Sequence, residues 1–159
     1  MNNSKTGDMV FMADAKARLN QMITKLKENK CRITPQRLAI LKILSASEGH
    51  PSVENIYTQV KVDFPTTSLA TVYKTLILMK ELKEVLEIGF GEGRNRYDGN
   101  KPYPHPHLIC TNCGKIVDPD LSVFTDMAQQ LAQDTGFHIV DHRLDFFGIC
   151  PDCQKKKSS

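Results

Sequence analysis

The sequence predicts an α+β protein with an N-terminal winged helix-turn-helix domain and a C-terminal α/β domain that holds a four-cysteine zinc site. Three observations predict this fold class. Short amphipathic segments with capping residues, followed by a hairpin signal, fill the first 98 residues. A proline-rich stretch then interrupts the pattern, and two Cys-x-x-C pairs lie beyond it. The predicted domains are residues 1–98 and 108–159, joined by a linker at 99–107.

Charge is distributed unevenly between the two predicted domains. Residues 1–99 hold 15 Lys and Arg against 11 Asp and Glu, a net charge of +4, whereas residues 100–159 hold six against seven, a net of −1. The basic N-terminal part is compatible with DNA binding. No secretory leader or membrane-length apolar run is evident, so we expect a cytoplasmic protein whose five cysteines serve metal or redox chemistry.

Four helices are expected in the N-terminal domain, after a frayed polar segment at residues 1–8. An amphipathic helix runs to about Lys30, and Thr34, Ser52 and Ser68 are candidate N-caps for the next three helices. Pro35 suits the first position of the second helix because its missing N–H needs no partner there. The expected inward residues are Leu19, Met22, Ile23 and Leu26, then Leu38, Leu41 and Leu44, then Val53, Ile56, Tyr57 and Val60, and finally Leu69, Val72, Leu76 and Met79.

The third and fourth helices have helix-turn-helix spacing. On the fourth helix, the outward side is expected to carry Thr71, Tyr73, Lys74 and Thr75. Residues 85–88 and 95–98 flank Phe90-Gly91-Glu92-Gly93, a hairpin signal. A helix-turn-helix followed by a hairpin is the winged-helix plan, although any small helical domain shows similar apolar stripes.

The C-terminal domain is expected to contain both strands and a helix. The pattern indicates a short strand at 108–109, a helix from about Ser122, and two strands on either side of Asp141-His142. The final Lys-Lys-Lys-Ser-Ser run is interpreted as a solvated end.

Four cysteines form two Cys-x-x-C pairs, Cys110 with Cys113 and Cys150 with Cys153. Four thiolates suit a closed, tetrahedral, structural zinc site. Two thioredoxin-like dithiols or buried free thiols are the alternatives, but redox pairs seldom occur twice in one small domain. The fifth thiol, Cys31, is expected to be a bystander that fills space in the core or on the surface.

A second group of residues offers nitrogen and oxygen ligands. His105 and His107 form a His-x-His pair, which alone is a weak signal and fits a solvated or buried structural pair equally well. His50, Asp98 and Asp118 extend the set to three imidazoles and two carboxylates. Such a set suits Fe²⁺, Mn²⁺ or Zn²⁺, and whether its members meet is left open by the residues alone.

Several segments together resemble the ferric uptake regulator (Fur) family, from about residue 15 to residue 153. They are Arg32-Ile33-Thr34-Pro35-Gln36-Arg37, Gly49-His50-Pro51, Ser68 to Tyr73, Arg96-Tyr97-Asp98, His105-x-His107-x-x-Cys110-x-x-Cys113-Gly114-Lys115, His142-Arg143-Leu144 and Cys150-x-x-Cys153. The resemblance implies a dimeric, metal-dependent DNA-binding repressor with a C-terminal dimerisation domain, and no enzymatic activity.

The resemblance also implies the roles of particular residues. Structural zinc would be bound by Cys110, Cys113, Cys150 and Cys153, and regulatory Fe²⁺ or Mn²⁺ by His50, Asp98, His105, His107 and Asp118. Contacts with an operator in double-stranded DNA would come from Arg37, Thr71, Tyr73, Lys74, Thr75, Arg94 and Arg96. A further metal site found in many relatives would need ligands where this chain has Pro104, Pro106 and Thr125, so that site is expected to be absent and His142 to be structural; His138 has no matching role.

The two acidic positions favour the peroxide-sensing branch of the family, in which both are typically aspartate, as Asp98 and Asp118 are here. In that branch, peroxide reacting at bound Fe²⁺ oxidises a ligand histidine, here His50 or His105, and the protein leaves DNA. The alternatives are an iron-responsive or zinc-responsive repressor of the same family and, in other classes, a metalloenzyme or a zinc-ribbon interaction module.

Overall fold

The computed structural model describes residues 4–89, 94–119 and 123–157. The chain divides into two compact units, Met1–Pro102 and Tyr103–Ser159, called the N-terminal unit and the C-terminal unit below. The division falls inside the predicted linker, and the limits of the predicted domains themselves stay predictions. Within the described part of the chain, no helix has the length and apolar character needed to cross a membrane.

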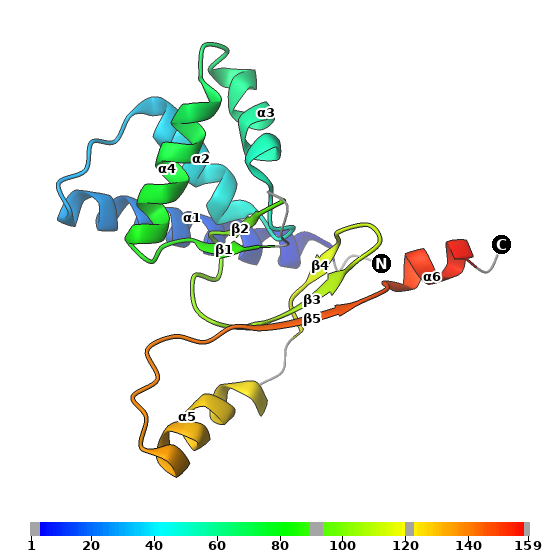
Figure 1. The fold of residues 1–159 in the computed structure, drawn as a ribbon. Coiled ribbons are helices and arrows are strands. Elements are labelled where there is room, and N and C mark those ends of the chain that lie inside the picture. Colours follow the sequence, from blue (N-terminus) through cyan, green and yellow to red (C-terminus); the bar gives the residue numbers. More distant parts are fainter. Residues whose placement is uncertain (1–3, 90–93, 120–122, 158–159) are drawn as a thin grey trace. The chain divides into compact units, whose positions relative to one another are not determined.

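The N-terminal unit consists of four helices and a hairpin (Figure 1). The elements are α1 (Ser4–Glu28), α2 (Pro35–Ala46), α3 (Val53–Asp63), α4 (Leu69–Glu81), β1 (Leu86–Ile88) and β2 (Arg96–Asp98). β1 and β2 pair in antiparallel register, with Leu86 opposite Asp98. The winged-helix order predicted from the sequence is confirmed, while the predicted hairpin turn at 90–93 lies outside the described residues.

All three predicted helix caps are confirmed. The side-chain oxygens of Thr34, Ser52 and Ser68 each accept a hydrogen bond, at 3.2 Å, from the backbone N–H three residues further along. Each bond satisfies an N–H that has no partner inside the helix. The expectation of a frayed segment was wrong for residues 4–8, because α1 already begins at Ser4, whereas residues 1–3 lie outside the described residues.

The core of the N-terminal unit is formed where the apolar faces of the four helices and the hairpin meet. Its fully buried members include Met22, Leu26, Ile40, Leu41, Leu44, Ile56, Val72, Leu76 and Met79. Five predicted inward residues are not fully buried. Leu19, Ile23 and Tyr57 are partly buried and pack against the core. Leu38 is half-buried and Leu69 is 38% exposed. Both lie in the first turns of their helices, and Ile40, which the expected stripe omitted, is buried instead.

Arg18 of α1 ties the end of the hairpin to the helices. Its Nε donates to the carbonyl oxygen of Gly99 at 2.7 Å, and Nη1 donates to Glu84 Oε2 at 2.6 Å. Its Nη2 donates to the backbone carbonyl of Glu84 at 2.7 Å. The buried guanidinium therefore fixes the chain immediately after Asp98.

The C-terminal unit is built on a three-stranded sheet with the order β4-β3-β5. Its elements are β3 (Pro106–Cys110), β4 (Ile116–Val117), α5 (Val123–Thr135), β5 (Leu144–Gly148) and α6 (Pro151–Lys157). β3 is antiparallel to β4 and parallel to β5. The fold class predicted from the sequence, α+β with a winged helix and an α/β domain, is confirmed.

One detail of the C-terminal unit differs from the prediction. Residues 136–143, all of them described, form no strand before β5, and Phe137 and Val140 are 74% and 82% exposed. An alternating sequence forms a strand only where a neighbouring backbone offers hydrogen bonds, and none of the described strands lies along this segment. The lysine run at the chain end is part of α6, which extends to Lys157, and Lys155 and Lys156 are exposed, as expected for a solvated end.

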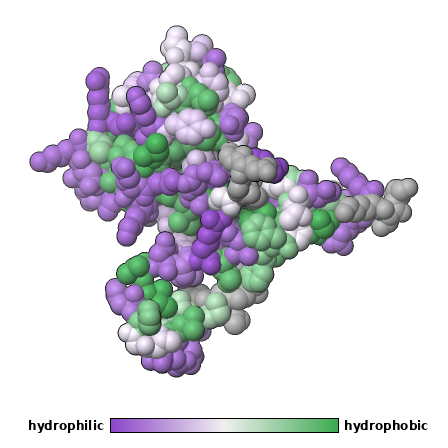
Figure 2. Space-filling view, in the orientation of Figure 1, coloured by the Kyte–Doolittle hydropathy of each residue, from purple (hydrophilic) through white to green (hydrophobic). Residues whose placement is uncertain are grey.

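One face of the C-terminal sheet is apolar and exposed. Leu108 pairs with both Val117 and Phe146, and these three side chains are 47%, 45% and 41% exposed. Figure 2 shows apolar surface over these strands. We call Leu108, Val117 and Phe146 the apolar stripe.

Candidate metal centres

Four cysteine sulfurs converge at one end of the C-terminal sheet. Cys110 ends β3, Cys113 lies in the following turn, and Cys150 and Cys153 lie at the start of α6. Their sulfur atoms all lie within 4.8 Å of one another, and Cys113 and Cys150 are 3.7 Å apart. A tetrahedral zinc with bonds of about 2.3 Å has sulfur atoms about 3.8 Å apart. The donor set and its spacing therefore fit a four-coordinate zinc ion.

The parallel pairing of β3 and β5 explains why the two Cys-x-x-C pairs meet. Parallel strands end at the same edge of a sheet, and one pair begins at the last residue of β3 while the other begins two residues after β5 ends. The backbone N–H of Thr111 donates to the carbonyl of Gly148 at 2.9 Å, which continues the contact beyond the strands. Cys110 and Cys150 are thereby held side by side across 40 residues of sequence.

Two of the cysteines, Cys110 and Cys153, have thiol pKa values that are shifted in opposite directions. Backbone N–H groups, first that of Cys150 and then that of Cys113, stabilise the Cys110 thiolate and lower its pKa to about 6. The side chain of Asn112 acts to lower the pKa of Cys153, but the neighbouring Cys150 and Cys113 and burial outweigh it and raise the pKa to about 12. Four thiolates this close repel one another, and a divalent cation is the chemical partner that stabilises them together.

The N-terminal unit holds a buried imidazole beside a buried carboxylate. His50 Nε2 lies 3.2 Å from Asp98 Oδ2, and these side chains are only 3% and 4% exposed. His50 occupies the turn between α2 and α3 with a φ of 50°, and Asp98 ends β2. The other oxygen, Asp98 Oδ1, accepts hydrogen bonds at 2.9 Å from the backbone N–H groups of Asn100 and Lys101, so Oδ2 is the oxygen directed at His50.

The C-terminal unit holds two imidazoles around a second carboxylate. His105 Nε2 lies 3.4 Å from Asp118 Oδ2, and His107 Nε2 lies 4.0 Å from Asp118 Oδ1. The two imidazole centroids are 4.4 Å apart. His105 Nδ1 lies 2.8 Å from the carbonyl oxygen of Tyr103, so that its Nε2 is left to face the carboxylate.

Asp145 also contacts this group, and the sequence analysis did not identify it. Asp145 Oδ1 lies 3.1 Å from His107 Nδ1, and the two side chains are 8% and 5% exposed. The sequence signal that could have identified Asp145 is an acidic residue within the otherwise apolar strand segment Leu-Asp-Phe-Phe. Its partner was not evident because the parallel register of β3 and β5 is not encoded locally.

The five predicted ligands of the regulatory metal thus form two groups, one in each unit. Each group combines imidazole nitrogen with carboxylate oxygen, which is the donor chemistry that Fe²⁺, Mn²⁺ and Zn²⁺ share. All five side chains are at least four-fifths buried, and buried ionisable groups of this kind are stable when they bind a metal or one another. The donor set therefore fits the predicted ion.

The predicted DNA contacts are mostly accessible, with one exception. Tyr73 and Lys74 are exposed on α4 and Thr71 is half-exposed, but Thr75 is only 1% exposed. The Thr75 hydroxyl donates to the carbonyl of Thr71 at 2.9 Å inside the helix, so the prediction that Thr75 faces outward was wrong. Thr75 lies three residues after Val72 and four before Met79, and residues with this spacing share one face of a helix, so Thr75 lies on the inward face of α4.

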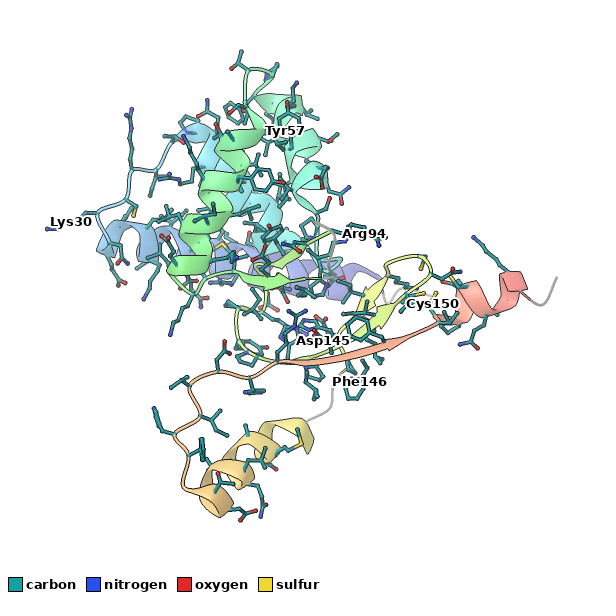
Figure 3. The ribbon with its side chains drawn as sticks, in the orientation of Figure 1. Lys30, Tyr57, Arg94, Asp145, Phe146 and Cys150 are labelled. Atoms are coloured by element: carbon teal, nitrogen blue, oxygen red, sulfur yellow. The ribbon has the colours of Figure 1, made fainter. Side chains whose placement is uncertain are left out.

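The three predicted arginines lie at the ends of local elements. Arg94 is exposed at the edge of the hairpin (Figure 3), and Arg96 Nη1 donates to Asn55 Oδ1 at 3.4 Å. Arg37 is half-buried, and its Nη1 donates to the backbone carbonyl of Arg32.

The remaining cysteine and histidines take no part in either centre within the described contacts. Cys31 is half-buried against the N-terminal core, as expected for a bystander. His138 and His142 are both exposed. The structural role expected for His142 is therefore not supported by burial of its side chain. The Thr125 side chain lies outside the described residues.

The fold and the two centres define a class of metal-binding DNA-binding regulator, and comparison with known proteins agrees. The ferric uptake regulator family matches residues 28–147, and the chain belongs to this family of transcriptional regulators. The predicted resemblance is confirmed, and the metalloenzyme and interaction-module alternatives are excluded.

Within this family, the chain is similar to both peroxide-responsive and ferric uptake regulators. The chain is 44% identical over 142 residues to the peroxide-responsive repressor PerR of Staphylococcus saprophyticus, covering 87% of this chain and 93% of that protein. The structure of the Campylobacter jejuni peroxide stress regulator matches with a TM-score of 0.67 at 31% identity, over 82% of this chain and 98% of that one. The structure of the Helicobacter pylori ferric uptake regulator shares the fold, with a TM-score of 0.74 at 23% identity. This match covers 88% of this chain and 93% of that one.

Proposed function

We propose that this PerR-like repressor senses peroxide through Fe²⁺ held by His50, Asp98, His105, His107 and Asp118. The observation that carries the proposal is the pair of buried imidazole–carboxylate groups, in which both carboxylates are aspartates. Identity of 44% to a peroxide-responsive repressor supports the choice of signal. When bound, Fe²⁺ would supply the chemistry that reduces peroxide and transfers one of its oxygen atoms to a neighbouring imidazole.

The residues of the chain would couple this chemistry to DNA binding. His50 and Asp98 belong to the N-terminal unit, whereas His105, His107 and Asp118 belong to the C-terminal unit. An ion bound by all five selects one arrangement of the two units, and only to the extent that it binds that arrangement more tightly. Protein without the ion is therefore expected to bind operator DNA poorly, and oxidation of His50 or His105 to restore that weak state.

The DNA-binding surface would be the exposed side of α4 together with the hairpin. Thr71, Tyr73 and Lys74 would reach base edges in the major groove, and Arg37, Arg94 and Arg96 would contact phosphates. Thr75 is no longer included because it is buried.

We infer a homodimer that binds its operator in the cytoplasm. The apolar stripe supports this inference, because exposed apolar side chains that adjoin one another on a sheet mark a surface covered by another chain. In the C-terminal unit, Zn²⁺ at Cys110, Cys113, Cys150 and Cys153 would be structural, because four thiolates leave no open coordination position.

Peroxide treatment followed by mass spectrometry tests the proposed signal. Protein loaded with Fe²⁺ is exposed to hydrogen peroxide, and the peptides that contain His50 and His105 are analysed for the gain of one oxygen atom. We expect this gain together with loss of operator binding, and neither change in protein loaded with Mn²⁺. Unmodified peptides and unchanged operator binding would instead identify a sensor of metal concentration.

A further inference from the structure

The two imidazoles of the C-terminal unit are held by different kinds of acceptor. His105 Nδ1 lies 2.8 Å from the neutral backbone carbonyl of Tyr103, whereas His107 Nδ1 lies 3.1 Å from the carboxylate of Asp145. In both rings this leaves Nε2 as the nitrogen that faces Asp118. Both histidines therefore direct Nε2 toward Asp118, but the group beside Nδ1 is neutral for His105 and negatively charged for His107.

Backbone pairing places Asp145 at His107. His107 and Asp145 are register partners in the parallel β3–β5 pair, so their side chains leave the sheet on the same side. Phe146 projects from the opposite side of β5 (Figure 3). The contact between His107 and Asp145 is nearly closed to water, with side-chain exposures of 5% and 8%.

A cation holds Asp145 in turn. Arg143 Nε donates to Asp145 Oδ2, while Oδ1 faces His107, so each carboxylate oxygen has its own partner. The Arg143 side chain is half exposed, whereas that of Asp145 is almost fully buried. The positive charge of Arg143 offsets the free energy that the Asp145 carboxylate loses when it is removed from water. The order Arg143, Asp145, His107 runs from the surface inward.

We propose that Asp145 is a positioning residue for the metal centre, which keeps a proton on His107 Nδ1, directs Nε2 to the ion and makes His107 a stronger electron donor than His105. This inference rests on the proposed function of His107 as a ligand. A carboxylate behind a ligating imidazole fixes the tautomer and ring orientation and increases the basicity of the coordinating nitrogen. A backbone carbonyl, as behind His105, fixes the orientation with less electron donation.

Mn²⁺ affinity tests the proposal in the full-length, zinc-loaded protein. We expect Asp145→Ala to weaken Mn²⁺ binding by about 10- to 100-fold, measured by the electron paramagnetic resonance signal of free Mn²⁺. Asp145→Asn keeps an oxygen that can accept from Nδ1, so its loss should be smaller. Asp141→Ala is the matched control, because it removes an exposed carboxylate four residues away whose Oδ1 accepts from the backbone N–H of His142; its affinity should equal that of the unaltered protein.

The tautomer of His107 gives a second readout that needs no bound regulatory metal. Nitrogen-15 NMR of the imidazole ring should report the Nδ1–H tautomer in the unaltered protein and in Asp145→Asn, and a shift toward Nε2–H in Asp145→Ala. Unchanged zinc content and circular dichroism establish that each variant is folded. An unchanged tautomer and unchanged Mn²⁺ affinity in Asp145→Ala would overturn the proposal.

Failure of the proposed function would give a different result. If His107→Ala binds Mn²⁺ as tightly as the unaltered protein, His107 is not a ligand and the function proposed for the centre fails. If His107→Ala loses binding while Asp145→Ala does not, the centre stands and the positioning role of Asp145 fails.

Discussion

Asp98 uses its two carboxylate oxygens for separate purposes. Oδ1 accepts the backbone N–H groups of Asn100 and Lys101, and Oδ2 lies beside His50. A carboxylate restrained in this way presents one oxygen in a fixed direction, as a pre-positioned ligand must. The short side chain of aspartate matters here because each added methylene would move the oxygen relative to the backbone that restrains it.

The same reasoning applies to Asp118, where chain length can be varied directly. Asp118→Glu moves the carboxylate away from the positions 3.4 and 4.0 Å from His105 and His107. We expect the Fe²⁺-loaded variant to retain metal-dependent operator binding and to accumulate less oxidised histidine per dose of peroxide, measured by mass spectrometry. Asp126→Glu, at an exposed position of α5, is the control. Equal oxidation in both variants would show that carboxylate length does not set peroxide sensitivity.

Tyr97 is expected to make the stability of the N-terminal unit decrease at high pH. Its pKa is raised above 10.0, first by burial and then by the nearby Tyr73, although the side chain of Asn95 acts to lower it. Because the folded state holds the phenolic proton more tightly than the unfolded state, this stabilisation is complete below about pH 10 and is lost as the pH rises through the folded pKa.

Tyr97→Phe separates this effect from packing. The variant loses the hydrogen bond of 3.1 Å to Glu87 Oε1 and is expected to lose about 1 kcal/mol of unfolding free energy at neutral pH. Urea unfolding at pH 8 and at pH 10.5 should show the difference between the two proteins shrinking at the higher pH. A constant difference would contradict the assignment to Tyr97.

At the scale of elements, the end of β2 is packed against α1 and α2. A Cβ added at Gly99 would lie 2.7 Å from Leu44 Cβ and 2.9 Å from Met22 Cε. The contact with Leu44 Cβ cannot be relieved by rotating a side chain, so the backbone itself must shift.

Gly99→Ala is therefore expected to destabilise the N-terminal unit by about 1–3 kcal/mol. Thermal unfolding monitored by circular dichroism measures the loss. Gly49→Ala is the matched control, because an added Cβ there meets nothing within 4 Å. Equal melting temperatures for the two variants would show that this close approach does not occur in solution.

Sequence pattern predicts the elements whose stabilising contacts are local. Thr34, Ser52 and Ser68 cap helices through bonds to residues three positions away, and the sequence identifies all three. Features that depend on distant contacts were missed. Thr75 is polar but buried by the packing of α4, and the expected strand before Asp141 has no neighbour with which to pair.

The candidate ligands were found for a different reason. Cysteines in Cys-x-x-C pairs and the His-x-His pair are conspicuous by residue type and spacing, and the family resemblance assigned them roles. Asp145 belongs to no motif, and only the register of β3 on β5 brings it to His107. The candidate ligands were therefore predictable from sequence, and the residue proposed to orient one of them was not.

At the scale of the whole molecule, the cysteine centre is expected to stabilise one unit selectively. Chelation of zinc should unfold the C-terminal unit, because the cysteine cluster joins the ends of β3 and β5, while the large core of the N-terminal unit remains. Hydrogen exchange followed by mass spectrometry should show lost protection in β3 and β5 and retained protection in α2 and α4. Uniform loss, or no loss, would contradict this division of stability.

Self-association is expected to depend on the apolar stripe. Phe146→Asp places a charge on the surface proposed to bind a second copy and should weaken dimerisation at least tenfold, measured by analytical ultracentrifugation. Val62→Asp is the control, because Val62 is 79% exposed on the N-terminal unit. If both substitutions weaken dimerisation equally, or if neither weakens it, the apolar stripe is not part of the dimer interface.

β3 carries residues of both candidate metal centres. Its second residue is His107 and its last is Cys110, about 10 Å apart in an extended strand. A slip of β3 by one residue against β5 would turn His107 to the opposite face and away from Asp145. The cysteine cluster lies at the end of this strand pair, and with a bound ion it is expected to oppose the slip. We therefore expect a newly synthesised chain to mature in sequence, taking up an ion at its cysteines before it can respond to the proposed signal.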